Sequence, residues 1–86
     1  MHELSIAIDV GRIAAEQAGP AGAESVRTVA LEVGTDAGVE FDSLEFCLEA
    51  VLSTPPFRAA KALIERRAGN ELRVAYLEVD DGHPDD

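Results

Sequence analysis

The sequence is poor in residues on which several kinds of protein depend: it has one cysteine, no tryptophan and only seven lysines and arginines. A single cysteine, Cys47, excludes an intrachain disulfide and any Cys-x-x-C metal clip within the sequence. No apolar run approaches the roughly 18 residues of a membrane-spanning helix, so we expect no bilayer span. The first residues lack the basic segment of a secretory signal, so we expect a cytoplasmic protein.

Net charge and chain length further narrow the classes of protein to which the sequence can belong. Seventeen acidic residues against seven basic ones give a formal net charge of −10. A surface of that sign repels a phosphate backbone, which argues against a nucleic-acid partner. The 86 residues, 47% of them hydrophobic, suffice for one small core. We therefore expect one domain over residues 1–80 and an acidic, disordered tail over residues 81–86.

Hydrophobic spacing predicts two helices with a strand between them. Residues 3–18 form an amphipathic pattern whose polar stripe is Ser5, Asp9, Arg12 and Glu16. Residues 26–33 alternate in polarity, which predicts a strand. The second helix is expected to begin with Asp42 as its N-cap, Glu45 completing a capping box, and Phe41 and Phe46 forming an apolar staple. Its expected buried stripe is Leu44, Cys47, Leu48, Val51 and Leu52, and Pro55-Pro56 closes it.

The C-terminal third is less clear. Residues 71–79 alternate in polarity and predict a strand, whereas residues 57–67 have the composition of a helix but precede a short link suited to a hairpin. The pattern alone does not decide between helix and strand for residues 57–67. Two helices covering one face of a small sheet, an α+β two-layer domain, is the economical arrangement.

No catalytic constellation emerges, so we expect no enzyme. Cys47 lies on the apolar side of its helix, which favours a structural thiol over a reactive one. His2 differs because of its position: the amine of Met1, the backbone nitrogen of residue 2 and the imidazole can close consecutive chelate rings on one cation. Nitrogen donors of this kind suit Ni(II), Cu(II) and Zn(II). The simpler interpretation is that His2 is a polar residue before a helix.

The N-terminal hexapeptide, Met1 to Ile6, resembles the start of the HypA/HybF nickel-incorporation proteins, the nickel metallochaperones of [NiFe]-hydrogenase maturation. Blocks at residues 31–34, 70–74 and 77–79 agree with it. The resemblance implies two helices on a three-stranded sheet in the order helix–strand–helix–strand–strand, with residues 60–66 as a strand. It further implies a nickel site made by Met1, His2 and Glu3, with Glu40 as an acidic residue after the first strand.

One departure from the family is large. Its zinc domain, with two Cys-x-x-C pairs, is inserted between the last two strands, where this sequence has only residues 67–70, so we expect no zinc site. Hairpin ends lie about 5 Å apart, so a tight turn is expected to replace such an insertion without unpairing the sheet. The partners implied by the resemblance are the nickel-delivery GTPase of hydrogenase maturation and the hydrogenase large subunit.

Two other functions remain open from the sequence. One is a metal-free interaction module that kept the fold after losing the zinc domain and binds a protein, or a second copy as a homodimer, through an edge strand or a helix face. The other is a small enzyme, for which the surplus of carboxylates is the sole support. Nickel binding with a planar Ni(II) spectrum would separate the carrier from both.

Overall fold

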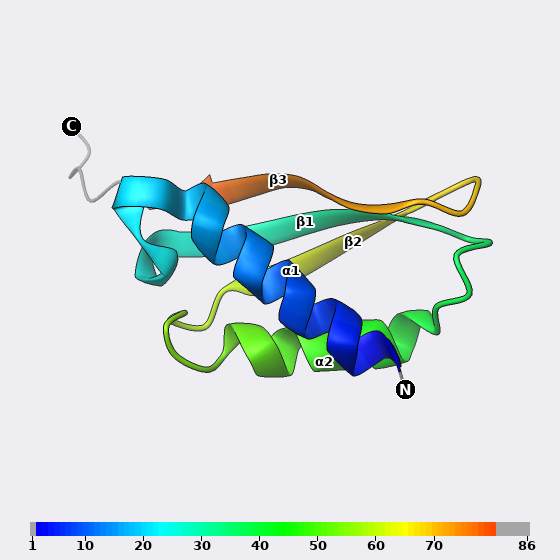
Figure 1. Cartoon of the computed structure of the whole chain (residues 1–86), viewed down its shortest axis with the longest axis horizontal. Coiled ribbons are helices and arrows are strands. Elements are labelled where there is room, and N and C mark those ends of the chain that lie inside the picture. The colour runs from blue at the N-terminus through cyan, green and yellow to red at the C-terminus, as the bar shows by residue number, and fades with distance from the viewer. Residues whose placement is uncertain (1, 81–86) are drawn as a thin grey trace.

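The computed structural model describes residues 2–80 of the chain; Met1 and the predicted tail over residues 81–86 lie outside this range. The elements follow the predicted order helix–strand–helix–strand–strand, which confirms the α+β fold class (Figure 1). They are α1 (His2–Ala18), the 3₁₀ turns η1 (Gly19–Ala21) and η2 (Ala23–Ser25), β1 (Val26–Gly34), α2 (Phe41–Leu52), β2 (Lys61–Arg67) and β3 (Leu72–Val79).

The three strands form one mixed sheet in the order β2-β1-β3. β1 is central, parallel to β2 and antiparallel to β3, so Leu31 pairs with Ile64 on one side and Val74 on the other. The helices pack on the sheet face that presents Val29, Leu31 and Val33, and all three side chains are fully buried. The alternation predicted for this strand therefore marks the side on which the helices lie.

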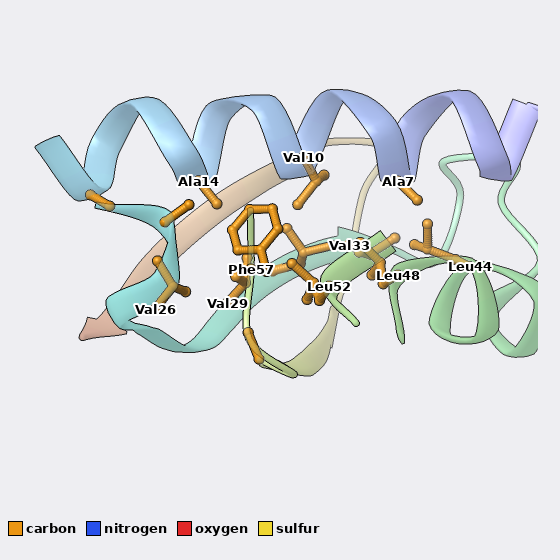
Figure 2. Packing of buried hydrophobic residues seen from close by; sticks show 14 residues of the cluster. Ala7, Val10, Ala14, Val26, Val29, Val33, Leu44, Leu48, Leu52 and Phe57 are labelled. Atoms are coloured by element: carbon orange, nitrogen blue, oxygen red, sulfur yellow. The ribbon is translucent and has the colours of Figure 1, made fainter. Parts of the chain in front are cut away.

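Small residues on α1 let the two helices approach closely. Figure 2 shows Ala7 and Val10 of α1 facing the leucines of α2, with Ala14 farther along α1 toward Val26 and Phe57. Three α2 positions spaced by four residues, Leu44, Leu48 and Leu52, are fully buried, as predicted, whereas Cys47 and Val51 are only partly covered. No helix within residues 2–80 is long and apolar enough to cross a bilayer.

The segment left undecided by local pattern is a strand, as the family resemblance implied. β2 takes Lys61–Arg67 into the sheet beside β1, and Ala62 and Ile64 pack against the core. Its composition favours a helix, but seven parallel pairings with the buried central strand outweigh that local preference. Pairing with β1, rather than local helix preference, therefore determines that residues 61–67 form a strand.

The predicted hairpin between the last two strands is wrong. β2 and β3 lie on opposite sides of β1, so their ends are separated by two strand spacings, about 10 Å, rather than one. The connecting residues 68–71 cross over the end of β1. Three backbone hydrogen bonds hold this crossover: Gly34 N donates to Glu71 O at 2.7 Å, Thr35 N to Arg67 O at 2.8 Å and Asp36 N to Gly69 O at 2.8 Å.

The predicted cap of α2 is also wrong. Glu40, not Asp42, is the N-cap, and its carboxylate accepts the backbone N–H of Ser43 at 2.8 Å. Phe46 is 73% exposed, and Phe41 instead lies under the guanidinium of Arg66, 4.3 Å from its ring centroid. A glutamate side chain is long enough to reach the N3 amide, so it takes the role that the sequence pattern assigned to an aspartate two residues later.

Candidate metal site

The first turn of α1 lies against the loop that leads into α2. In Figure 1 the N-terminal end of α1 lies beside the first turn of α2, at the opposite end of the molecule from the last residues of β3. The His2 side chain is 63% exposed, and its Nε2 atom is 3.2 Å from the carbonyl oxygen of Gly38. The ring therefore lies at the surface near the chain start rather than in the apolar core.

Glu3 is the one charged residue in the part of the chain described, residues 2–80, that is buried, with 7% of its surface exposed. Its carboxylate accepts the backbone N–H of Glu40 at 3.0 Å and lies 3.8 Å from Nε2 of His2. The hydrogen bond from Glu40 lowers the pKa of the Glu3 carboxyl below its ordinary value of 4.5; burial opposes this shift, while its own N–H and the charge of His2 add to it. Glu3 thus joins the start of α1 to the start of α2.

Glu40 lies in the same region, but its carboxylate is turned toward α2 to cap Ser43. The structure thus brings together three of the four predicted site residues, His2, Glu3 and Glu40, while Met1 lies outside the described residues. Within residues 2–80, no three histidine, cysteine or carboxylate side chains gather so as to hold a metal ion. A metal at this position would depend on nitrogen atoms of the chain start.

The backbone of the first α1 turn supplies such nitrogens. The first four N–H groups of any α-helix have no acceptor within the helix, and here they include those of His2 and Glu3. Metal coordination by the His2 backbone nitrogen would break no hydrogen bond inside α1. The site also adjoins a cavity of about 310 Å³ between α1 and β3, lined mostly by apolar side chains such as Ile6, Val10 and Leu72.

Sequence reasoning missed what the Glu3 and Glu40 carboxylates do. The sequence places both at the site as metal contacts, which stays a prediction, and in the structure each accepts a backbone N–H group at the start of α2. One signal was present: residue 3 lies four residues before Ala7, on the side of α1 that faces the protein. An acidic residue at such a position needs a hydrogen-bond donor from elsewhere, because a buried charge without a partner is costly.

Comparison with known proteins agrees with the resemblance noted in the sequence. A family model described as "Hydrogenase/urease nickel incorporation, metallochaperone, hypA" matches residues 1–72. The chain belongs to the HypA family. Proteins named hydrogenase maturation factor HypA are 50% identical over 78 residues in Chlorobium phaeobacteroides, 49% over 51 residues in Azotobacter chroococcum and 41% over 66 residues in Geotalea uraniireducens.

This chain corresponds to part of those HypA proteins. The matches cover 91%, 59% and 77% of its residues, but 60%, 45% and 57% of the respective relatives. All three matches thus span less than two thirds of the relative. The family membership fixes the kind of domain, and the activity of the longer proteins does not transfer with it.

Proposed function

We propose that this protein is a nickel-binding accessory protein, a metallochaperone for [NiFe]-hydrogenase maturation. The observation that carries the proposal is the match of residues 1–72 to a nickel-incorporation family, combined with an exposed His2 at the chain start. Relatives of up to 50% identity are named as hydrogenase maturation factors. We further propose that it acts in the cytoplasm.

The proposed ligands are the amine of Met1, the backbone nitrogen and imidazole of His2, and atoms of Glu3 and Glu40. Support comes from chemistry: amine and imidazole nitrogens suit Ni(II), and the N–H of His2 lacks an acceptor inside α1. The Glu3 carboxylate, 3.8 Å from the ring, adds negative charge that favours a divalent cation, and Glu40, whose backbone N–H binds Glu3, is proposed as an additional oxygen donor. Cu(II) is the main competitor, because it stands above nickel in the affinity order.

The mechanism is ligand exchange without turnover. Binding releases protons from the amine and from the backbone nitrogen, so affinity falls as the pH falls. A partner that offers a competing ligand set takes the metal when its site is the more stable one. We propose that the partners are the nickel-delivery GTPase and the hydrogenase large subunit, and that no zinc site is needed within these residues, since the sequence has no Cys-x-x-C pair.

Nickel titration of the protein with its native, tag-free N-terminus tests the proposal. We expect one Ni(II) per chain and a d–d absorption band typical of planar nickel. His2→Ala and a form extended by one residue before Met1 should both lose the band. His83→Ala, which alters a histidine far along the sequence, serves as the control and should keep it. Equal affinity in all four proteins would contradict a terminal site.

A second candidate, a metal-free interaction module, is favoured by the sheet face away from the helices. Leu63 of β2 and Tyr76 of β3 both pair with Ala30 of β1 on this face, and they are 43% and 44% exposed. Exposed apolar side chains on an open sheet suit protein contact. Retained capture of a maturation protein by His2→Ala, together with no nickel binding by the wild type, would favour this candidate.

A further inference from the structure

The contacts of the His2 ring define which of its nitrogens carries the proton. Nε2 lies 3.2 Å from the Gly38 carbonyl oxygen and 3.8 Å from an oxygen of the Glu3 carboxylate. A carbonyl oxygen and an ionised carboxylate accept hydrogen bonds and donate none. The neutral ring satisfies these neighbours only when Nε2 carries the hydrogen, which leaves the lone pair on Nδ1.

Nδ1 is also the nitrogen that chelation at this position requires. A metal bound to the backbone nitrogen of His2 closes a six-membered ring through Cα, Cβ and Cγ to Nδ1, whereas Nε2 lies on the far side of the imidazole. The terminal amine closes a five-membered ring with the same backbone nitrogen. The hydrogen bond to Gly38 and the geometry of chelation therefore select the same tautomer.

We propose that the Gly38 carbonyl and the Glu3 carboxylate are positioning groups, which hold the His2 ring protonated on Nε2 and present Nδ1 to the metal. This inference rests on the proposed nickel function. In this proposal the Glu3 carboxylate orients the His2 ring and is anchored on the loop before α2, and it does not itself bind the metal. Metal-binding histidines generally donate their second ring N–H to a carbonyl or carboxylate, and the loss of such a partner weakens metal affinity about 10–100-fold.

Both acceptors are fixed by the fold before any metal arrives. The Glu3 carboxylate is buried and anchored on the backbone N–H of Glu40 at 3.0 Å. Gly38 has φ +77°, a left-handed conformation that glycine adopts without strain and that other residues rarely adopt. The hydrogen bond from Glu40 links the two acceptors, because Glu40 follows Gly38 by two residues in the same loop.

The first experiment needs no metal. Proton–nitrogen correlation spectra of the ring at about pH 8, above the ordinary histidine pKa of about 6.5, report the tautomer. The reference is a synthetic peptide, Met-His-Glu-Leu-Ser-Ile, which has the chelating atoms but no Gly38 loop. We expect the Nε2–H tautomer alone in the protein and a mixture in the peptide, and the Gly38 carbonyl carbon shift should change in His2→Ala. A protein spectrum equal to that of the peptide, or an Nδ1–H ring, would overturn the proposal.

The second experiment compares nickel affinities. Glu3→Ala removes the anchor and should weaken binding about 10–100-fold, toward the affinity of the peptide. Glu3→Gln keeps an oxygen that accepts the Glu40 N–H and should retain most of the affinity. Glu16→Gln removes one exposed carboxylate from the same helix and controls for charge. Equal losses in Glu3→Gln and Glu3→Ala, with Glu16→Gln unchanged, would show that the carboxylate is a ligand and refute a positioning role.

The two experiments separate the inference from the function on which it rests. If the wild type binds no nickel while its ring is held as Nε2–H against Gly38, the proposed function fails and the positioning of the ring stands. If nickel binds with the expected band while the ring behaves as it does in the peptide, the function stands and the positioning role is refuted.

Discussion

The crossover between β2 and β3 makes a strong prediction about Gly34. A Cβ atom at this position would lie 2.8 Å from the backbone nitrogen of Asn70 and closer still to the carbonyl oxygen of Gly69. Both are backbone atoms, so Gly34→Ala fits only if the crossover moves. Overpacking of this kind costs about 1–3 kcal/mol, and each of the three crossover hydrogen bonds that is lost adds about 1 kcal/mol. With one of these hydrogen bonds lost, we expect a total loss of about 2–4 kcal/mol.

That loss is large for a chain of this size, whose whole stability is about 4–13 kcal/mol. Urea unfolding, followed by far-UV circular dichroism, measures it directly, and the melting temperature should fall by about 4–8 °C per kcal/mol. The matched control inserts two glycines between Ala68 and Gly69, which lengthens the crossover at a cost well under about 1 kcal/mol. In the protein with the longer crossover, Gly34→Ala should lower the free energy of unfolding much less. An equal cost in both backgrounds, or no cost in the native one, would refute the explanation.

Two further predictions concern the start of α2. Glu40→Ala should lower the free energy of unfolding by about 1 kcal/mol because α2 loses its cap, whereas Asp42→Ala, at the position predicted from sequence, should cost clearly less in the same urea titration. Glu3→Gln tests the lowered pKa of the Glu3 carboxyl. Because this pKa is lower in the native state than in the unfolded state, the charged carboxylate stabilises the fold at any pH above the unfolded pKa. The stability advantage of wild type over Glu3→Gln should therefore be full at neutral pH, shrink as the pH falls through the native pKa and vanish below it; an advantage that persists in stronger acid would contradict it.

The elements with clear periodicity were predictable from the sequence. The polar stripe of α1 and the alternation in β1 reflect burial on one side, and both elements have nearly the predicted bounds. β2 was not predictable by pattern, because its strand state depends on pairing with β1, a segment some 30 residues earlier. The resemblance to a known family predicts this strand, which the local composition does not.

The errors also have physical causes. A short link between two strands resembles a hairpin turn, yet it can equally cross the end of a third strand when that end offers a glycine, as Gly34 does here. The sequence predicts the cap of α2 at Asp42 because aspartate is the commoner N-cap, whereas in the structure the helix begins at Phe41 and Glu40 reaches the Ser43 amide with its longer side chain. The burial of Glu3 is not predictable from the local sequence, because the partner of its carboxylate, the Glu40 amide, is 37 residues away.

A series of contacts from His2 to Ser43 limits how the start of the protein can hold a metal. His2 faces Glu3, Glu3 accepts the N–H of Glu40, and Glu40 accepts the N–H of Ser43. Each carboxylate accepts its N–H group through one oxygen, so a metal bound through that oxygen would leave a backbone N–H group at the start of α2 to water, whereas the second oxygen stays available. Coordination by amine, backbone and ring nitrogens requires no such loss. The nitrogen set is therefore the part of the proposed site that the fold can offer with no change in the hydrogen bonds that join α1 to α2, and the free carboxylate oxygens can add to it only from where those bonds hold them.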